Sequence, residues 1–461
     1  MQHKIKLENV TKVHFIGVGG ISMNGLAQIL ARDGYVVSGS DKQASEVTRI
    51  LQKAGIDIKV PNAADNISPE YDLIVFTDAI QPDNPEYARA VELGLPMMGR
   101  ASLLKIITQG YERTVCVAGS HGKTTTTALL ASVAQAAGLD PTVHVGGHVA
   151  GALNNRVGES PFFLLEACEY KNNFLQWHPY IGVILNIDAD HNDFYGGGID
   201  GLIDSFAQFA RNIHPEGALI INAQTQGFDR IVAGLACRVI SFGLYENPTG
   251  VHLYPRDVSF SDGGQPYFSA VKGDEVLASV DLALVGEHNI ANALACFAVA
   301  EALALAPQAV KRGLEAAPGV KRRYEYKGEF NSVPIIDDYA HHPTEVRACL
   351  AASRKKHSGR IVCVFQPHLY SRTRDLMEEF ANSFGDADKV LLLPIYAARE
   401  VHDPTVSSEQ LCDLMRRRNC DVECFDDFYT AEQWLRLHLV AGDLLLTVGA
   451  GNVHLIAETL L

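Results

Sequence analysis

The sequence predicts an α/β protein with three domains, in which helices cover mostly parallel sheets. Short apolar stretches alternate with helical patterns along the whole chain, and this alternation is typical of parallel sheets. The chain has 461 residues, whereas a single core stops growing near ~250–300 residues. We therefore expect three domains, over residues 1–110, 111–320 and 321–461.

In the first domain, a strand at Val13–Gly17 leads through a glycine-rich turn into a helix over Ser22–Asp33. Further strands are expected at Tyr35–Asp41 and Leu73–Thr77, and a second helix runs through Tyr87–Leu93. Strands that alternate with helices in this way imply a parallel sheet.

The second domain opens with a strand at Arg113–Gly119 and closes with a helix at Asn289–Ala304. Residues Val251–Val280 alternate apolar and polar side chains around glycine turns, a pattern that favours a small antiparallel sheet. The other expected elements of this domain are a helix at Thr124–Ala137 and strands at Phe162–Glu166 and Gly182–Asn186. Strands of the third domain are expected at Pro334–Asp337, Arg360–Phe365, Lys389–Leu393 and Asp443–Val448.

Composition narrows the class of protein. The net charge of −15 disfavours nucleic-acid binding, so an anionic substrate must be held by local basic groups and backbone N–H groups. Nine cysteines are scattered singly, and Cys420 and Cys424 have no matching pair for a zinc site, which favours reduced thiols. The N-terminus lacks the apolar core of a signal peptide, and no apolar stretch reaches the ~18 residues of a membrane span. We expect a cytoplasmic protein.

The strongest motif follows the first strand of the second domain and opens a helix: Gly119, Ser120, His121, Gly122, Lys123, Thr124 and Thr125. In a strand–loop–helix context, backbone N–H groups and the helix N-terminus face a phosphate, and the lysine reaches the outer phosphates. We therefore predict ATP binding here, with the Thr124 hydroxyl on Mg²⁺. The alternative is a purely structural role as a glycine-containing helix cap.

A second glycine cluster, Gly17, Gly19, Gly20 and Ser22, resembles the dinucleotide fingerprint but has Ser22 in place of the last glycine. Asp41 ends the next strand, where an acid can bond a ribose hydroxyl. The cluster can hold either NAD(P) or the diphosphate of a nucleotide sugar. The alternative is a purely structural role as a tight turn.

Acidic and histidine groups follow two strands of the second domain. Glu169 comes shortly after Phe162–Glu166, and Asp188–Asp193, which includes His191, follows Gly182–Asn186. Ligands of open α/β sheets gather at such strand ends, and Mg²⁺ prefers oxygen ligands. We predict Glu169 as a metal ligand and His191 as a second metal ligand or a phosphate-orienting group. Helix capping is the alternative.

Three further groups of residues are candidates for binding. His288 can stack on adenine while Asn289 or Asn292 bonds its edge, unless they only cap a helix. Asp338, Tyr339 and His341 follow a third-domain strand and can grip a ribose and a small zwitterion. Arg372 and Arg374 can clamp carboxylate or phosphate oxygens, or simply pair with nearby surface acids.

Taken together, these motifs resemble the Mur ligase family over nearly the whole chain. The segments on which this resemblance rests are Gly17–Met23, Gly119–Thr127, Asn186–His191, Asp337–Glu345 and Phe365–Asp375. The resemblance implies a Rossmann-like UDP-substrate domain, a central P-loop ATPase-like domain and a C-terminal Rossmann-like domain that delivers an amino acid. It also implies that Arg323 reaches ATP, and that Tyr339, His341, Arg372 and Arg374 surround the amino acid and the reacting carboxylate.

The resemblance implies an activity and its rivals. The expected reaction joins L-alanine to UDP-N-acetylmuramate through an acyl phosphate, using ATP and Mg²⁺, with Lys123, His191, His341, Arg372 and Arg374 in the catalytic site. The expected assembly is a monomer or weak homodimer. A related ligase that recycles a muramyl tripeptide shares the fold, and an NAD(P)-dependent oxidoreductase is the rival from another class. The chain departs from some branches by having no lysine between Asn192 and Asn212, and Cys168 and Asp78 are also unusual.

Overall fold

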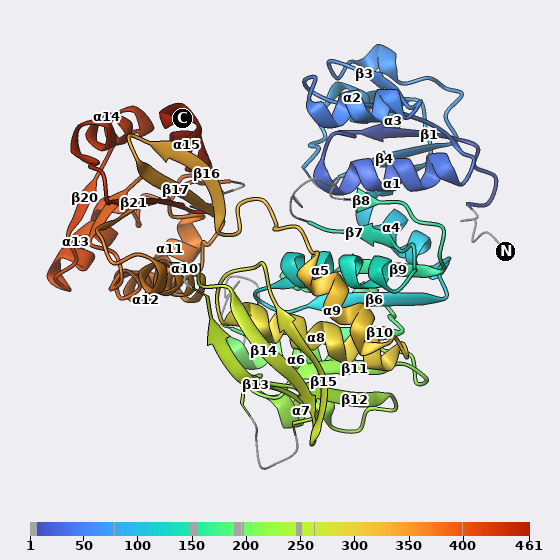
Figure 1. Ribbon diagram of the computed structural model, residues 1–461. Helices are drawn as coiled ribbons and strands as arrows, with labels where there is room; N and C mark the ends of the chain where they lie inside the picture. Colours follow the sequence, from blue (N-terminus) through green and yellow to red (C-terminus); the bar gives the residue numbers. More distant parts are fainter. Residues whose placement is uncertain are drawn as a thin grey trace. The chain divides into compact units, whose positions relative to one another are not determined.

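The computed structural model describes residues 7–77, 79–146, 155–188, 195, 198–245, 251–261, 263–398 and 400–461 (Figure 1). The chain divides into two compact units. The first comprises Met1–Asn186, Asp204–Ser241 and Ala295–Gly313, and the second comprises Ile187–Ile203, Phe242–Leu294 and Leu314–Leu461.

The N-terminal part of the first unit contains a five-stranded sheet in the order β3-β2-β1-β4-β5. All four pairings in this sheet are parallel. The central strand β1 has four fully enclosed residues because its apolar side chains face helices on both sides of the sheet. The elements are β1 (Lys12–Ile16), α1 (Ile21–Arg32), β2 (Val36–Ser40), α2 (Glu46–Lys53), β3 (Asp57–Lys59), η1 (Ala64–Asn66), β4 (Leu73–Phe76), α3 (Pro85–Glu92), β5 (Met97–Gly99) and α4 (Arg100–Gln109).

A second sheet of the first unit follows the order β12-β11-β10-β6-β9-β7-β8. Its inner pairs are parallel, and β8 is an antiparallel edge strand on β7. The buried strand β6 feeds directly into α5, which places the predicted phosphate loop at the carboxyl edge of the sheet. The elements are β6 (Arg113–Ala118), α5 (Lys123–Ala136), β7 (Thr142–His144), β8 (Asn155–Arg156), β9 (Phe162–Glu166), η2 (Tyr170–Gln176), β10 (Ile181–Ile184), α6 (Ile199–Arg211), β11 (Ala218–Asn222), α7 (Phe228–Val232) and β12 (Arg238–Phe242).

The second unit begins with three antiparallel strands, β13 (Leu253–Phe260), β14 (Pro266–Lys272) and β15 (Glu275–Asp281), which confirm the pattern predicted for Val251–Val280. Its six-stranded sheet has the order β16-β17-β21-β18-β19-β20, parallel except for β16. Its remaining elements are β16 (Glu325–Phe330), β17 (Val333–Asp338), α10 (Pro343–Lys356), β18 (Ile361–Phe365), α11 (Tyr370–Asp375), α12 (Met377–Ala381), β19 (Lys389–Leu392), α13 (Ser408–Arg417), β20 (Val422–Cys424), α14 (Phe428–His438), β21 (Leu444–Val448) and α15 (His454–Leu460). The helices α8 (His288–Ala302) and α9 (Pro307–Glu315) belong partly to each unit, since residues 295–313 are assigned to the first.

Alternating side chains of the six-stranded sheet build two separate cores. Ile336, Cys363 and Leu446 belong to one buried cluster, while Ile335, Val364 and Leu445 belong to the other. Because successive residues of a strand face opposite sides, continuously apolar strands indicate a sheet covered on both faces. The predicted α/β architecture with mostly parallel sheets is confirmed.

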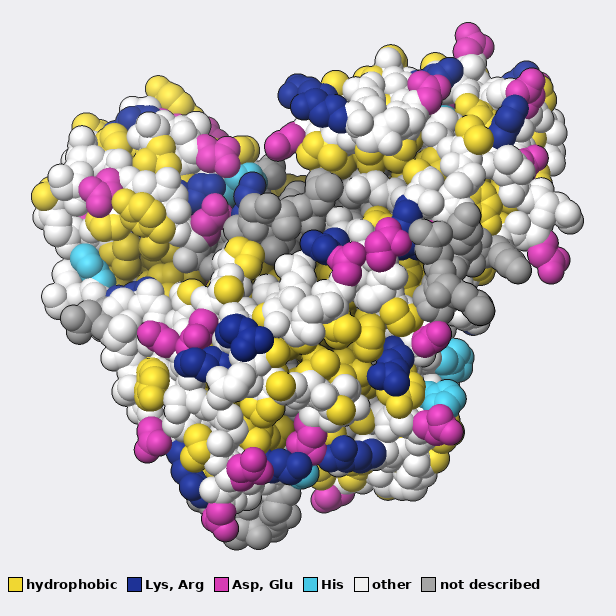
Figure 2. Space-filling view, turned by 45° about the vertical axis from the view of Figure 1, so that its right-hand side comes forward, with side chains coloured by type: hydrophobic (Ala, Val, Ile, Leu, Met, Phe, Trp, Pro, Cys, Tyr) yellow, Lys and Arg dark blue, Asp and Glu magenta, His cyan; other side chains and the backbone are white. Residues whose placement is uncertain are grey.

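The surface shows no strong charge segregation on the face that Figure 2 presents. Basic and acidic side chains are interspersed there among polar and apolar groups. Among the described helices, none combines the length and the apolar character that a membrane crossing requires.

Candidate nucleotide and substrate sites

The loop between β6 and α5 folds back over its own lysine. Gly119 and Gly122 have φ angles of +144° and +82°, in the left-handed region that favours glycine. The Lys123 Nζ donates to the carbonyl oxygens of Gly119 and Ser120, the latter at 3.0 Å. The first N–H groups of α5 have no partner within the helix, so the lysine and the helix N-terminus form an anion site.

Glu169 balances the charge of this lysine. One carboxylate oxygen lies 2.9 Å from Lys123 Nζ, and both side chains are nearly enclosed, at 13% exposed for Lys123 and 3% for Glu169. Burial alone lowers the pKa of Lys123, but the Glu169 carboxylate, together with Cys168 and Glu166, outweighs burial and raises that pKa well above its usual range. The ammonium is therefore charged at any physiological pH.

Asn186 fixes the other side of the loop, a role that sequence reasoning did not assign to it. Its side-chain oxygen accepts from His121 N at 2.8 Å, and its side-chain nitrogen donates to His121 O at 3.1 Å. Its backbone oxygen also accepts from Ser120 N at 3.1 Å. This paired amide contact holds the loop against the end of β10.

The residues around Lys123 suit a magnesium ion chemically. Thr124 is buried in the first turn of α5, as is its neighbour Thr125. The Thr124 hydroxyl and the Glu169 carboxylate are hard oxygen donors, and the hydroxyl itself donates to Glu166 Oε2 at 2.9 Å. Such donors are those that Mg²⁺ prefers. The predicted ligand His191 lies outside the described residues, as does Asp78.

The first glycine turn is organised by an acid. Gly19 N donates to Asp41 Oδ2 at 2.8 Å, and a Cβ on Gly19 would lie 2.7 Å from that oxygen. Gly17 N and Val18 N both donate to Ser40 O at 2.9 Å. The structure thus brings Gly19 and Asp41 together, with Asp41 bonded to the turn itself, and Gly20 caps α1.

Ser22 joins this turn to the neighbouring sheet of the same unit. Its hydroxyl lies 2.8 Å from His144 Nε2 on β7, and Arg100 donates to it at 3.1 Å. Burial, together with the Arg100 charge, lowers the pKa of His144 to about 3. His144 is therefore neutral, and the Ser22 contact is a neutral hydrogen bond at physiological pH.

The start of α8 contains the predicted adenine-side residues. Asn289 and Asn292 are both buried, and Asn292 Nδ2 donates to Asn289 Oδ1 at 2.9 Å. Asn289 Nδ2 in turn donates to Val285 O at 2.8 Å and lies 3.2 Å from His288 Nε2. The three side chains form one polar cluster at a helix start, which fits both adenine binding and the capping alternative.

The end of β17 places several predicted residues side by side. Tyr339 lies under Arg323, whose guanidinium carbon is 5.5 Å from the ring centre, and the rings of Tyr339 and His341 meet edge to face. Glu345 lies 3.3 Å from His341 Nδ1 and 3.6 Å from Arg323. Asp338 is buried; burial raises its pKa to about 6, although it accepts from two backbone N–H groups.

Arg322, the other member of the arginine pair, has a role that sequence reasoning missed. It binds Asp337 at 2.8 Å and donates to the carbonyl oxygens of Gly449 and Gly451. These contacts tie the chain before β16 to the ends of β17 and β21. The glycine-rich segment after β21 was the available signal, because the carbonyl oxygens of its buried residues Gly449 and Gly451 require a donor.

The two predicted clamp arginines differ. Arg372 is buried and donates to His368 Nδ1 at 3.1 Å, and the His368 ring meets His341 edge to face at 5.7 Å. Arg374 is half-exposed and pairs with Asp375 at 3.0 Å and Asp403 at 2.9 Å. Arg372 thus joins the His341 group, whereas Arg374 matches the surface-pair alternative.

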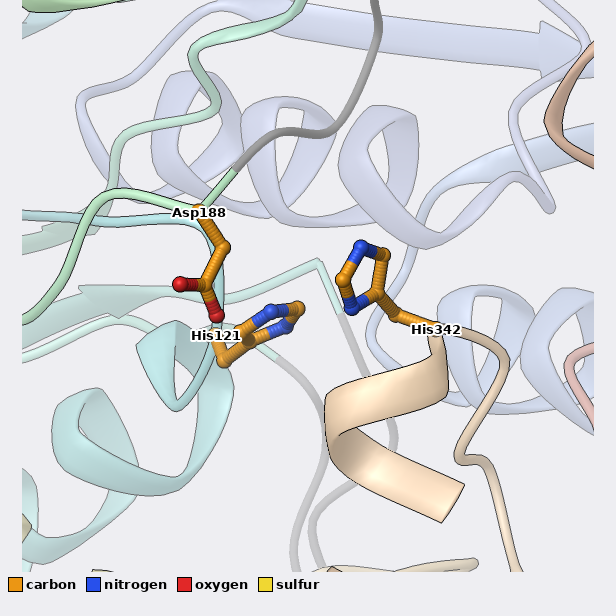
Figure 3. A group of neighbouring side chains, drawn as sticks. All are labelled: His121, Asp188 and His342. Atoms are coloured by element: carbon orange, nitrogen blue, oxygen red, sulfur yellow. The ribbon is translucent and has the colours of Figure 1, made fainter. Parts of the chain in front are cut away.

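Figure 3 labels three side chains that lie near the ends of helices or strands. His121 lies in the loop after β6, Asp188 lies beyond β10, and His342 is the N-cap of α10. His121 belongs to the first unit, and the other two belong to the second. His342 already accepts from Thr344 N in a capping box with Glu345. No metal site is assigned to these three residues.

Comparison with known proteins agrees with this arrangement. Residues 12–112 match the Mur ligase family catalytic domain, residues 117–300 the Mur ligase middle domain, and residues 322–451 the Mur ligase glutamate ligase domain. A UDP-N-acetylmuramate–L-alanine ligase from Agathobacter rectalis is 43% identical over 460 residues, covering 100% of this chain and 99% of the relative. The chain belongs to the Mur ligase family. An equally named relative of this Mur ligase from Clostridium kluyveri is 42% identical, covering 97% of each chain.

Solved structures show the same fold for this Mur ligase. The crystal structure of UDP-N-acetylmuramate-alanine ligase from Thermotoga maritima has a TM-score of 0.79 at 26% identity, covering 97% of this chain and 98% of that one. A murein peptide ligase from Psychrobacter arcticus has a TM-score of 0.71 at 23% identity, covering 98% of both chains, and this similarity concerns the fold alone.

Proposed function

We propose that this Mur ligase uses ATP to join L-alanine to the carboxylate of UDP-N-acetylmuramate, releasing ADP and phosphate. Relatives that are 41–43% identical over 97–100% of the chain bear the name of that activity. The observation that carries the chemistry is Lys123, buried at a strand–loop–helix junction and held charged by Glu169. The family does not favour the oxidoreductase alternative.

The three predicted domains divide the work. Residues 1–110 bind the UDP part through Gly17, Gly19, Gly20, Ser22 and Asp41. Residues 111–320 bind ATP through the loop from Gly119 to Thr125, and His288, Asn289 and Asn292 bind its adenine. Residues 321–461 deliver the amino acid, while Arg323 and Asp338 reach the nucleotide.

A carboxylate must be activated before an amine can displace its oxygen. A carboxylate oxygen of the sugar acid attacks the γ-phosphorus of ATP, ADP leaves, and an acyl phosphate forms. Phosphoryl transfer depends on positioning and on charge neutralisation, which the Lys123 ammonium supplies. Thr124, Glu169 and His191 would hold Mg²⁺, which neutralises phosphate charge when bound.

The second step forms the amide. The neutral amine of L-alanine attacks the acyl carbon, and the C–O bond to phosphate breaks. His341, within reach of Glu345 and beside Tyr339, is our candidate for accepting the amine proton. Arg372 lies on His368 next to this group and stabilises carboxylate oxygens. Arg374 serves the same substrates only if its bonds to Asp375 and Asp403 open.

The setting of this reaction follows from its substrates. The product is a peptidoglycan precursor, so the enzyme supports cell-wall formation and with it cell shape and division. We place it in the cytoplasm, where nucleotide-linked substrates occur, as a monomer or weak homodimer.

Phosphate release tests the activity. The purified chain is supplied with ATP and Mg²⁺, and with L-alanine, glycine, L-serine or a tripeptide, each with UDP-N-acetylmuramate or UDP-N-acetylglucosamine. We expect rapid release only when L-alanine and UDP-N-acetylmuramate are both present. If the tripeptide supports turnover and L-alanine does not, the recycling alternative replaces this proposal.

Isotope transfer tests the intermediate. UDP-N-acetylmuramate carrying ¹⁸O in both carboxylate oxygens should give one labelled oxygen in the released phosphate and one in the new amide. Unlabelled phosphate would contradict an acyl phosphate.

A further inference from the structure

Resting on the ATP loop of the proposed reaction, we propose that Glu166 is a positioning residue that orients the Thr124 hydroxyl toward the cation. Glu166 is the last residue of β9. Its Oε2 accepts from Thr124 Oγ1 at 2.9 Å and from Gly146 N at 2.7 Å. The sequence pattern predicts Glu169 as a metal ligand and indicates no role for Glu166.

The direction of the hydroxyl proton decides what Thr124 can bind. A threonine hydroxyl has one proton and two acceptor lone pairs. Because the proton points at Glu166, the lone pairs are left for a cation at the N-terminus of α5. A carboxylate acceptor also makes the hydroxyl oxygen a better ligand, as groups around a metal site commonly do for its ligands.

The carboxylate is held in place by the sheet. Glu166 pairs with Val117 of β6, two residues before the loop begins at Gly119. Gly146, just beyond β7, packs against the Glu166 carboxyl group: a Cβ there would lie in van der Waals contact, 3.4 Å from three of its atoms. The carboxylate is thus fixed between β6 and β7 on the side that faces Thr124.

Glu166 and Glu169 therefore have different functions. Glu169 forms an ion pair with Lys123 at 2.9 Å, whereas Glu166 accepts hydrogen bonds from the uncharged donors Thr124 Oγ1 and Gly146 N. The loss of Glu166 should weaken only the part of ATP binding that depends on the cation through Thr124.

A double-mutant cycle tests this proposal by calorimetry with the non-hydrolysable analogue AMP-PNP. Four proteins are compared, with Mg²⁺ and with EDTA: the parent chain, Glu166→Ala, Thr124→Val and the double variant. We expect Glu166→Ala to weaken Mg²⁺-dependent binding about tenfold but not to weaken binding in EDTA, because without the cation the Glu166 carboxylate only repels the phosphates. In the Thr124→Val background the same change should have no further effect, because coupled residues are not additive.

Matched variants separate positioning from folding. Glu166→Gln keeps an oxygen acceptor and should retain most of the magnesium effect, and the exposed Glu159→Ala should change nothing. Glu166→Met, which keeps the length of the side chain without an oxygen acceptor, should reproduce the loss and serves if Glu166→Ala does not fold.

Two results have distinct meanings. A full additional loss in the double variant would overturn the proposal, since Glu166 would then act independently of Thr124. If the parent chain itself fails to bind Mg²⁺ and AMP-PNP together, the proposed ATP-dependent activity is wrong.

Discussion

The two glycine-rich turns of the first unit share a strand–turn–helix plan but differ in charge. The turn after β1 contains no lysine, and its Gly19 N–H donates to the Asp41 carboxylate. The loop after β6 instead encloses Lys123, whose charge is balanced by Glu169. One turn is thus organised by an acid bound to the backbone, and the other by a buried ion pair.

This difference teaches what each turn can hold. A buried ammonium at a helix N-terminus suits the concentrated charge of a triphosphate. A turn built from backbone N–H groups suits a diphosphate that is already esterified on both sides. In the proposed function the same sequence pattern therefore serves two nucleotide ligands, and the lysine distinguishes the ATP site from the UDP site.

Removing the lysine should give the largest effect. Lys123→Ala deletes the charged group that faces the transferred phosphate in the proposed reaction, and a loss of more than about 100-fold in kcat is expected, as for other transition-state donors. Coupled phosphate-release assays measure it. Lys53→Ala, an exposed lysine of α2, is the matched control and should keep normal turnover. Near-normal turnover of Lys123→Ala would contradict the claim that this lysine distinguishes the function of the second turn from that of the first.

The support beneath the first turn can be broken without touching the turn. Glu86 is fully buried and accepts from Ser40 Oγ, Asn66 Nδ2 at 2.7 Å and Asn62 Nδ2 at 3.0 Å. Glu86→Ala removes the acceptor that these three donors share, and we expect a loss of about 3 kcal/mol in unfolding free energy. Urea unfolding measures it, and Glu86→Gln, which keeps one of the two acceptor oxygens, should lose less.

Glu86 should also make this domain acid-sensitive. Burial alone raises the pKa of Glu86, but bonds from His14, Ser40 and Asn66 outweigh it and lower that pKa. Its contribution is thus present above the unfolded pKa, near 4.5, and is lost as the pH falls through the folded value. The difference between parent and Glu86→Gln should therefore shrink below pH 4.5; a constant difference would contradict this.

Asp41 provides a smaller and more selective test. Asp41→Ala removes the acceptor of Gly19 N, and we expect about a tenfold rise in KM for UDP-N-acetylmuramate, the size of one hydrogen bond to a charged group. The KM for ATP should not change, because the other turn is intact. Asp41→Asn keeps an oxygen acceptor, so its KM for UDP-N-acetylmuramate should lie between those of the parent and Asp41→Ala. A rise in both KM values would show that the turns are not independent.

The smallest effect concerns the contact between the first turn and β7. Burial lowers the pKa of His144 to about 3, so the unfolded chain takes up a proton below pH 6.5 that the folded chain does not. The free energy of unfolding should therefore decrease as the pH is lowered below 6.5, and this group alone should make it ~0.8 kcal/mol smaller at pH 6 than at alkaline pH. His144→Gln should remove that part of the acid sensitivity between pH 7 and pH 5, measured by thermal unfolding. An unchanged pH dependence would contradict the neutral Ser22 contact.

Much of the fold could be predicted because apolar strands and glycine turns are local signals. Phe162–Glu166 and the antiparallel segment are confirmed by β9 and β13–β15. Short edge strands such as β3 and β20 have only three residues each, too few for a recognisable period. The pairing between Lys123 and Glu169 was also beyond sequence reasoning, because the two residues meet only through the register of β6 and β9.

Residue type alone could not separate similar side chains. Arg372 and Arg374 are both arginines of α11, yet one is buried on His368 and the other pairs with surface acids. Glu166 and Glu169 are likewise three residues apart, and only their partners, Thr124 and Lys123, distinguish them. Roles of this kind follow from which face of an element each side chain occupies.

Calorimetric titration of ATP into the full-length chain tests the central claim most directly. The parent should bind ATP much more tightly with Mg²⁺ than with EDTA, and Lys123→Ala should lose that binding while it still binds UDP-N-acetylmuramate through the first turn. If the folded parent shows no magnesium-dependent binding of ATP, or if Lys123→Ala binds it equally well, the assignment of the β6–α5 loop is contradicted.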